Sequence, residues 1–424
     1  MNNEYAFEMA TSAIRFGFGV TREVGAELAD QGKRHVMVLT DPNLRNLPPV
    51  ATVLESLEEN GVRFSLFDRV RVEPTDESLL EAIGAAQAGD FDAFVAVGGG
   101  STMDTAKAAN LFSCYPGELL DHVHAPIGKG LPVPGPLKPL IAVPTTAGTG
   151  SETTGVVIFD FTRMHAKVGI AHRLLKPSLG LIDPENTRTL PPGVAASTGL
   201  DVLSHAAESY TALPFDQRPR PERPALRTTY QGSNPISDVW SLEALRLVAA
   251  FLRRAVADPG DDDARGAMLL AAAYAGIGFG NAGVHLPHGM SYPVSGLVRS
   301  YRPPGYAVDH PLVPHGFSVI LNTPAVVRFA APACPERHLR VAEALGADIS
   351  RAKPDDAGKI LAGRVLEFMR DLGVPNGLAG VGYTTADIPA LVEGTLPQHR
   401  VTKLCPRPAS PDDLARIFAD AMAW

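Results

Sequence analysis

The sequence is 424 residues long, with 45% hydrophobic and 20% charged residues, a composition typical of a globular protein with room for two or more domains. Its net charge of −8 argues against binding to nucleic acid, which requires a basic surface. No segment approaches the roughly 18 consecutive apolar residues of a membrane-spanning helix, so we expect no membrane association.

The cysteines and the N-terminal residues bear on location. Cys114, Cys334 and Cys405 are widely spaced and odd in number, which is typical of a reducing compartment. Residues 1–19 lack a long apolar stretch and contain Glu4 and Glu8, a composition that fits neither a secretory signal nor an acid-poor transit peptide. We therefore predict a cytoplasmic protein.

Short apolar segments alternate with amphipathic helical patterns between residues 35 and 190. This alternation is typical of a Rossmann-like α/β domain, in which helices cover both faces of a parallel sheet and ligands bind at the carboxyl ends of the strands. The predicted strands are His35–Thr40, Arg63–Phe67, Phe91–Val97 and Leu140–Pro144, and the predicted helices between them are Pro49–Glu59 and Ser78–Ala88.

Alanine-rich helical patterns replace the strands from Leu190 onward. The predicted helices are Gly193–Tyr210, Ser237–Ala257, Ala264–Gly276, Pro335–Leu345, Ala357–Leu372 and Pro411–Met422. Because Asp183-Pro184 and Pro191-Pro192-Gly193 interrupt the chain, we predict an α/β domain over residues 1–190 and an all-helical domain over residues 191–424.

A glycine segment, Gly98-Gly99-Gly100-Ser101, directly follows a predicted strand and precedes a helical stretch. Glycines allow a phosphate to approach the backbone, and a helix N-terminus offers free amides, so the segment predicts a pyrophosphate-binding loop. A plain tight turn is the alternative. Asp41, just past the first predicted strand, favours NAD over NADP because it would repel a 2′-phosphate, although Asp41-Pro42 also suits a simple turn.

Asp201 and His205 lie four residues apart and therefore on one face of a predicted helix. His288 lies within residues 278–290, a stretch with almost no charge, and His288 and His315 would complete a four-ligand cage. One carboxylate and three imidazoles suit Fe²⁺ or Zn²⁺, as well as Co²⁺ or Ni²⁺, better than Mg²⁺ or Ca²⁺. A solvated i,i+4 pair is the alternative for Asp201 and His205, but the apolar surroundings favour a metal site.

Several segments resemble the iron-containing (group III) alcohol dehydrogenases and occur in the order found in that family. These segments are Gly98–Asp104, Pro144–Glu152, Gly199–Ala206, His288–Met290 and Pro314–Gly316. Three others resemble the hydroxyacid-oxoacid transhydrogenase subfamily, namely Tyr230–Asp238, Gly278–His285 and Val401–Leu404. The resemblance implies a dehydroquinate synthase-like architecture with a nucleotide-binding first domain and a metal-binding second domain.

The resemblance also implies roles for individual residues. The expected cofactor contacts, besides Asp41, Gly98, Gly99, Gly100 and Ser101, are Asp104, Thr145, Thr146, Thr149, Lys167 near the nicotinamide ribose, and Leu181 beside the nucleotide. Most family members have a further histidine four residues after the ligand equivalent to His288, whereas this chain has Tyr292. Tyr292 and His285 are therefore the candidates for a proton relay, with ordinary buried packing as the alternative for both. Arg227 is our first choice for binding a substrate carboxylate.

The implied activity is oxidation of a hydroxy acid, such as 4-hydroxybutyrate, coupled through bound NAD to reduction of an oxo acid, such as 2-oxoglutarate. One alternative is an ordinary NAD-dependent alcohol dehydrogenase that exchanges its cofactor. Another is a lyase of the dehydroquinate synthase kind, against which the apolar residues 278–290 argue. We expect a homo-oligomer, a dimer or larger.

Overall fold

The computed structural model describes residues 3–164 and 166–424. Residues 1 and 2, with which the first predicted domain begins, lie outside them. The chain forms two compact units. The α/β unit comprises Thr11–Leu190 and Pro259–Ala273, and the helical unit comprises the described part of Met1–Ala10 together with Pro191–Asp258 and Tyr274–Trp424.

The two units differ from the predicted domains in two segments. The first ten residues belong with the helical unit, where the Glu8 amide donates to Gln231 Oε1 (2.8 Å) and the Ala10 amide donates to Asn281 Oδ1 (3.0 Å). Residues 259–273 belong with the α/β unit, where Arg265 Nη1 donates to the Thr187 carbonyl (3.2 Å). Neither pairing between distant segments has a local signal in the sequence.

A six-stranded parallel sheet forms the centre of the α/β unit, in the order β1-β8-β5-β4-β2-β3. Every residue of β4 is buried, which explains its continuous apolar sequence. The predicted strands are confirmed to within two residues at each end, and four further strands were not predicted. The strands are β1 (Ala13–Phe16), β2 (His35–Leu39), β3 (Arg63–Phe67), β4 (Ala93–Gly98), β5 (Leu140–Pro144) and β8 (Leu179–Ile182), with an antiparallel hairpin of β6 (Val156–Phe161) and β7 (Ala166–Ala171).

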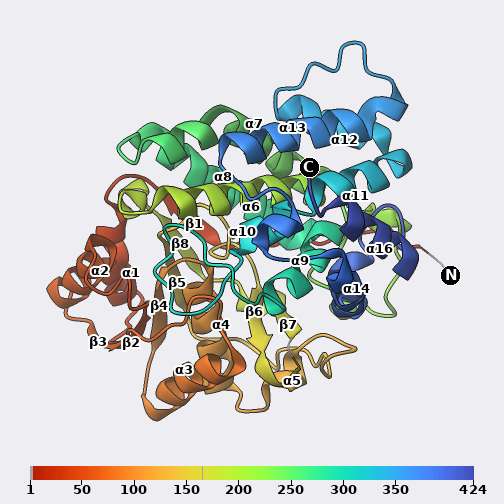
Figure 1. The fold of residues 1–424 in the computed structure, drawn as a ribbon. Helices are drawn as coiled ribbons and strands as arrows, with labels where there is room; N and C mark the ends of the chain where they lie inside the picture. The colour runs from red at the N-terminus through yellow and green to blue at the C-terminus, as the bar shows by residue number, and fades with distance from the viewer. Residues whose placement is uncertain (1–2, 165) are drawn as a thin grey trace. The chain divides into compact units, whose positions relative to one another are not determined.

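Helices cover both faces of this sheet (Figure 1). Helices α1 (Val24–Asp30) and α2 (Pro48–Glu59) pack on one face, where Leu28 and Leu57 meet Val38. Helices α3 (Asp76–Ala88) and α4 (Gly100–Cys114) pack on the other, against the alternate residues of β2. Burial of each such leucine contributes about 2 kcal/mol, so the helices on both faces of β2 stabilise the sheet.

The strand order reverses between β2 and β4. The connection through α2 leads from β2 outward to β3, whereas the connection through α4 leads from β4 to β5 on the opposite side. In open α/β sheets, ligands bind at the carboxyl ends of the strands beside such a reversal. The residues that follow β2 and β4, Asp41 and Gly99, therefore flank the expected nucleotide site.

Helices alone build the rest of the described chain from residue 191 onward, apart from isolated bridges. Helix α6 packs against α7 and α10. The predicted helices are confirmed, and Pro287 also indicated a helix start between His285 and His288, where α9 begins, whereas α10, α11, α14 and α15 were not predicted. The helices are α6 (Pro192–Thr211), α7 (Pro235–Ala257), α8 (Asp262–Ala282), α9 (Leu286–Gly296), α10 (His315–Ile320), α11 (Thr323–Ala330), α12 (Pro335–Ala344), α13 (Ala357–Asp371), α14 (Ile388–Thr395), α15 (His399–Thr402) and α16 (Pro411–Asp420), and α5 (Leu119–His122) is a single turn in the α/β unit.

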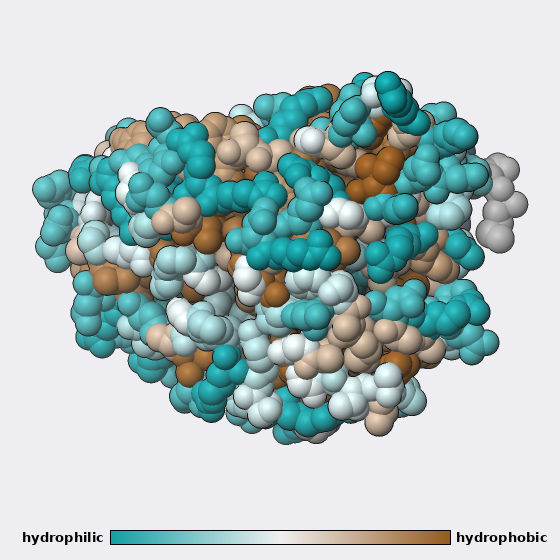
Figure 2. Space-filling view, turned by 45° about the horizontal axis from the view of Figure 1, so that its top comes forward, coloured by the Kyte–Doolittle hydropathy of each residue, from teal (hydrophilic) through white to brown (hydrophobic). Residues whose placement is uncertain are grey.

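The face of the molecule in Figure 2 is mostly hydrophilic, with hydrophobic residues in separate groups. The most exposed large apolar side chains, Val239 (65%) and Tyr5 (64%), come from distant parts of the sequence. Among the described helices, none is by itself long and apolar enough to cross a membrane, and α8 and α9 meet that test only as a pair bent by 104°.

The homo-oligomer expected from the sequence stays a prediction.

We predict that Gly25→Ala destabilises the α/β unit. A Cβ at Gly25 would lie 2.0 Å from the Ser56 carbonyl oxygen, so α1 and α2 would have to separate, at a cost of about 2 kcal/mol. The control is Gly84→Ala on the exposed face of α3, where nothing lies within 4 Å and the change stabilises by about 0.5–1 kcal/mol. Thermal unfolding followed by circular dichroism checks this, and equal midpoints for the two variants would contradict it.

Candidate functional site

Four side chains of the helical unit converge on one point. Asp201 and His205 lie on α6, His288 on α9 and His315 at the first position of α10, and one ligand atom from each lies within 4.8 Å of the others. Asp201 is 3.6 Å from His288 Nε2, 3.7 Å from His205 Nδ1 and 3.8 Å from His315 Nε2. These separations are too long for hydrogen bonds but close to the roughly 3.4 Å expected between ligands that stand about 2.1 Å from a tetrahedral metal.

Three buried atoms of this cluster have no hydrogen-bond partner among the described residues: Asp201 Oδ1, His205 Nδ1 and His288 Nε2. Leaving a buried polar atom unpaired costs about 1–3 kcal/mol, and a shared cation removes that cost for all three. Burial lowers the pKa of His205 to about 3, so its ring is neutral, as a metal ligand must be. The donor set therefore fits a divalent transition metal.

Glu208, which was not among the predicted site residues, holds His288 in position. Nδ1 of His288 donates to Glu208 Oε1 (2.6 Å), which leaves the lone pair of Nε2 toward Asp201. The backbone amide of His285 donates to the other oxygen, Oε2 (2.6 Å). A signal for Glu208 was present, since it follows Asp201 and His205 at helical spacing on an otherwise apolar helix.

The charges around His288 favour a cation there. Burial opposes a charge on this ring, but the carboxylates of Glu208 and Asp201 outweigh that effect and raise the pKa of His288 to about 10. Burial likewise opposes ionisation of Asp201, yet the surrounding histidines hold the pKa of this carboxyl below its usual range. The cluster thus stabilises positive charge at its centre, whether a proton or a metal ion supplies it.

Packing fixes the remaining geometry of the cluster. The ring of Phe279, on α8, stacks on His205 with centroids 3.9 Å apart. A Cβ at Gly316 would lie 1.9 Å from the Ser197 carbonyl oxygen, so only glycine allows α10 to approach α6 closely enough to bring His315 to Asp201. The side chain of His315 is 24% exposed, whereas those of the other three residues are at most 5% exposed, so the cluster opens on the His315 side.

The predicted catalytic residues occupy different surroundings. Helix α9 begins at Leu286, with His285 as its N-cap residue, and His285 Nε2 lies 3.0 Å from Thr211 Oγ1. Burial lowers the pKa of His285 to about 4. Tyr292 follows His288 by one helical turn, and its hydroxyl accepts a hydrogen bond from Arg400 Nη2 (2.7 Å).

Arg227 already has a carboxylate partner. Its Nε and Nη2 donate to the two oxygens of Glu4 at 3.0 and 3.1 Å. Hydrogen bonds from Arg227 outweigh burial and lower the pKa of Glu4 to about 2, so this pair is ionised at neutral pH. The predicted role of Arg227 in substrate binding therefore lacks geometric support.

In the α/β unit, the structure brings two predicted cofactor segments together. A Cβ at Gly99 would lie 3.1 Å from Thr146 Oγ1, and one at Gly100 would lie 2.6 Å from Thr149 Cγ2. Gly99 is the N-cap of α4 and provides no side-chain cap for the helix amides. Backbone amides, small residues and hydroxyls thus meet where β4 ends, an arrangement suited to a phosphate group.

Other predicted cofactor residues use their polar groups within the protein. Asp104 accepts hydrogen bonds from Ser151 Oγ (2.7 Å) and the Ile158 amide (2.9 Å). Nζ of Lys167 pairs with Glu73 (2.5 Å) and Asp160 (3.2 Å). These two residues position the segments around the glycine loop.

The remaining predicted cofactor residues also contact other residues of the α/β unit. Asp41 Oδ1 accepts from the amide of Asn43 (2.8 Å), as in a simple turn, and burial raises the pKa of this carboxyl. Ser101 Oγ accepts from the Glu73 amide (3.1 Å). Thr145 is buried, and Leu181 is fully buried in the core between the sheet and α1 and α2. Leu181 therefore contacts core side chains in this structure.

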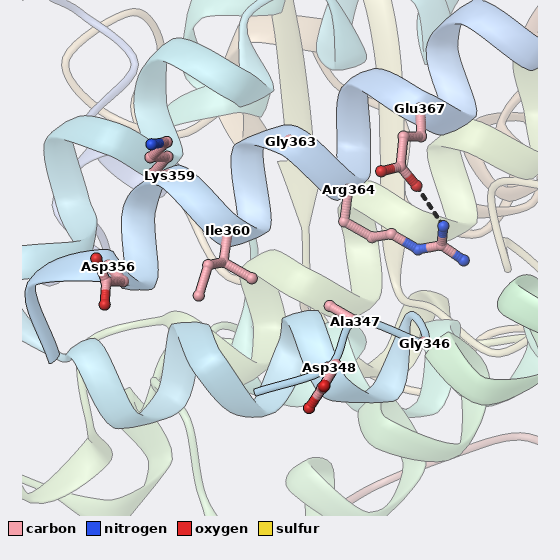
Figure 3. Close-up of a pocket in the computed structure, with 9 residues that line it drawn as sticks. All are labelled: Gly346, Ala347, Asp348, Asp356, Lys359, Ile360, Gly363, Arg364 and Glu367. Atoms are coloured by element: carbon pink, nitrogen blue, oxygen red, sulfur yellow. Dashed lines mark hydrogen bonds and ion pairs between the residues drawn. The ribbon is translucent and has the colours of Figure 1, made fainter. Parts of the chain in front are cut away.

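A separate surface pocket lies between α13 and the segment that follows α12 (Figure 3). Asp348, Lys359 and Arg364 are among its charged lining residues, and Arg364 is paired with Glu367. None of the predicted site residues lines this pocket, and nothing in it identifies a ligand.

Comparison with known proteins agrees with this geometry. The family model "Iron-containing alcohol dehydrogenase" matches residues 11–184, and "Fe-containing alcohol dehydrogenase family, C-terminal" matches residues 229–422. A mitochondrial hydroxyacid-oxoacid transhydrogenase of Bos taurus is 60% identical over 421 residues, which cover 99% of this chain and 90% of the relative.

Two solved structures share the fold. An alcohol dehydrogenase from Oenococcus oeni superposes with a TM-score of 0.86 at 27% identity, over 98% of this chain and all of that one. A sulfoacetaldehyde reductase from Bifidobacterium kashiwanohense in complex with NAD⁺ superposes with a TM-score of 0.80 at 25% identity, over 99% of both chains. The predicted combination of a Rossmann-like domain and an all-helical domain is thus confirmed.

The predicted cytoplasmic location is wrong. Relatives of Bos taurus, Pongo abelii and Homo sapiens, 60–61% identical to this chain, are mitochondrial proteins. The prediction rested on the composition of residues 1–19, and that composition is not a sufficient guide to location.

The family models and the near full-length similarity agree on the class of protein. Together the two models span most of the sequence, in the order expected from the glycine segment and the metal cluster. The chain is an oxidoreductase, and it belongs to the iron-containing alcohol dehydrogenase family.

Proposed function

We propose that this enzyme oxidises a hydroxy acid and reduces an oxo acid in alternation, with NAD carrying hydride between them. The observation that carries the proposal is the buried Asp201–His205–His288–His315 cluster in a chain that is 60% identical to hydroxyacid-oxoacid transhydrogenases. The proposed substrates are of the 4-hydroxybutyrate and 2-oxoglutarate types. A dehydrogenase with exchangeable NAD is the alternative.

The four clustered residues would hold one divalent cation, and we propose Fe²⁺ as the native ion, with Zn²⁺ as the alternative. A bound cation supplies Lewis acidity, which favours loss of the substrate hydroxyl proton and polarises a carbonyl in the reverse direction. Glu208 keeps the proton of His288 on Nδ1, so that Nε2 can serve as a ligand. The donor set and the family support this proposal.

NAD supplies the hydride acceptor. We assign its pyrophosphate to Gly98, Gly99, Gly100 and Ser101, with hydroxyls from Thr146 and Thr149, because these groups meet where β4 ends. Asp41 remains the proposed determinant of NAD preference, since a 2′-phosphate beside its carboxylate would be repelled. Asp104 and Lys167 then act by positioning these segments rather than by contacting the nucleotide.

Of the two candidates for the proposed proton relay, Tyr292 is favoured over His285. The Tyr292 hydroxyl lies one helical turn from His288 and is positioned by Arg400, so it is the better candidate to donate to a substrate oxygen. The ring of His285 is bonded to Thr211 and its amide to Glu208, which supports a positioning role.

The metal proposal predicts that His288→Ala loses bound metal and activity. Glu208→Gln should retain the four ligands but bind the metal about 10–100-fold more weakly, because the acceptor that fixes the His288 tautomer is weakened. The measurement is metal content by mass spectrometry after equilibration with a competing chelator. His338→Gln is the control, since His338 is a buried histidine of the helical unit outside the cluster. Full occupancy in His288→Ala would remove that residue from the site.

Gly100→Ala should weaken NAD binding at least tenfold, or about 1.4 kcal/mol. The added Cβ would overlap Thr149 and push the two cofactor segments apart. Fluorescence titration with NADH measures the effect, and Thr149→Ser in the same chain should restore part of the affinity by removing Cγ2. Gly84→Ala is the control. Unchanged affinity in Gly100→Ala would contradict the assignment.

The overall proposal predicts direct transfer of deuterium from substrate to product. The protein, purified without added nucleotide, is given 4-hydroxybutyrate deuterated at the alcohol carbon together with 2-oxoglutarate. Deuterium should appear at C2 of 2-hydroxyglutarate, because bound NAD accepts it from one acid and delivers it to the other. If turnover instead requires free NAD and proceeds without an oxo acid, the ordinary dehydrogenase is the correct description.

A further inference from the structure

Arg400, on the short helix α15, has hydrogen-bonding capacity that the described protein does not use. Nη2 donates to the Tyr292 hydroxyl (2.7 Å), whereas Nε and Nη1 are buried and have no hydrogen-bond partner among the described residues. Arginine remains charged at all relevant pH values and has five N–H donors. Buried charged donors without partners destabilise the folded protein. This guanidinium is therefore suited to donate hydrogen bonds to an acceptor atom that is not part of the described chain.

No described carboxylate compensates the charge of Arg400. Its immediate neighbours are two tyrosines: Tyr292, and Tyr230, whose ring centroid lies 5.0 Å from the guanidinium carbon. Burial raises the pKa of Tyr230 to about 12, so that hydroxyl is neutral. The remaining partner suited to Arg400 is therefore an anion.

Two structural connections place Arg400 beside the metal cluster. Tyr292 follows His288 by four residues on α9, which corresponds to about 6 Å along the helix axis and the same helix face. On the other side, the ring of Tyr230 lies edge-on to Phe279 (6.4 Å), and Phe279 stacks on His205. Arg400 is thus connected to His288 through Tyr292, and to His205 through Tyr230 and Phe279.

We propose that Arg400 binds the carboxylate of both acids, with Tyr292 and Tyr230 holding its guanidinium. This inference rests on the proposed function for the identity of the acids. In 4-hydroxybutyrate, two methylene carbons separate the reacting carbon from the carboxylate. In 2-oxoglutarate, two methylene carbons separate the reacting carbon from the distal carboxylate. One cation at a fixed distance from the reacting carbon therefore serves both acids.

Other arginines of the helical unit have hydrogen-bond partners. Arg227 is bound to both oxygens of Glu4, and Arg299 is paired with Asp387. Arg218 Nη1 donates to the Tyr230 carbonyl (2.6 Å). Among these candidates, Arg400 combines a buried charge with unused donors.

The test compares an acid with its neutral counterpart. The pre-steady-state rate at which enzyme-bound NAD is reduced is measured with 4-hydroxybutyrate and with 1,4-butanediol, in which a hydroxymethyl group replaces the carboxylate. In Arg400→Gln, the apparent second-order rate constant for the acid should fall roughly 10- to 100-fold more than that for the diol, because loss of the Tyr292 contact affects both substrates whereas loss of the cation affects only the acid. Arg400→Lys should give an intermediate loss, because it keeps the charge but not the planar donor geometry.

Arg337→Gln is the matched control. Arg337 also lies over a tyrosine ring, that of Tyr210, but it is paired with Asp238 and donates to a backbone carbonyl. The acid-to-diol ratio should stay at the wild-type value in this variant. Equal losses for acid and diol in Arg400→Gln, with a lowered unfolding midpoint, would show that Arg400 only supports the fold and would overturn the inference.

Direct binding separates this inference from the proposed function. Calorimetric titration with 2-oxoglutarate should show binding to the wild type, about 10- to 100-fold weaker binding to Arg400→Gln, and a smaller loss of affinity in Arg400→Lys. Equal affinity in all three proteins, or no binding to the wild type, would overturn the carboxylate site. If binding depends on Arg400 but no deuterium passes between the acids, the transhydrogenase proposal fails and the carboxylate site stands.

Discussion

The hydrogen bonds of one buried carboxylate, Glu208, hold the helical unit's site together. Both oxygens are occupied, one by the ring of His288 and one by the amide of His285, so α6 is connected to the start of α9. A carboxylate buried without such partners would cost several kcal/mol. Because these bonds also fix the tautomer of His288, the same interaction stabilises the fold and prepares a metal ligand.

Much of the fold and the four-residue cluster could be predicted because their signals are local. The residues of β2 and β4 are apolar enough to indicate buried strands, and the spacing of Asp201 and His205 indicates one helix face. Helix α10 has only six residues, with Pro314 before it and Gly316 beside its ligand, so helix propensity could not identify it. The partners of Glu208 and Arg400 depend on contacts between segments 80 and 108 residues apart, for which a single sequence has no signal.

A family resemblance does not separate residues that would contact the nucleotide from residues that hold the nucleotide-binding loop in place. Gly99 and Gly100 lie against the side chains of Thr146 and Thr149, and these residues remain the proposed nucleotide contacts. Asp104 and Lys167 instead direct their charges to Ser151, Glu73 and Asp160. A motif includes both kinds of residue, because a loop that must hold a phosphate also needs side chains that hold the loop. Only the hydrogen bonds distinguish the two roles.

The division of binding groups between the two units suits an alternating reaction. The proposed nucleotide residues belong to the α/β unit, whereas the metal cluster and Arg400 belong to the helical unit. The contacts proposed to hold NAD would therefore be distinct from those proposed to hold the acid, and an acid could leave without loss of the nucleotide. If one arginine anchors both acids, they compete for a single position, so the first product must depart before the second acid binds. A reaction in two half-steps then follows from one shared anchor.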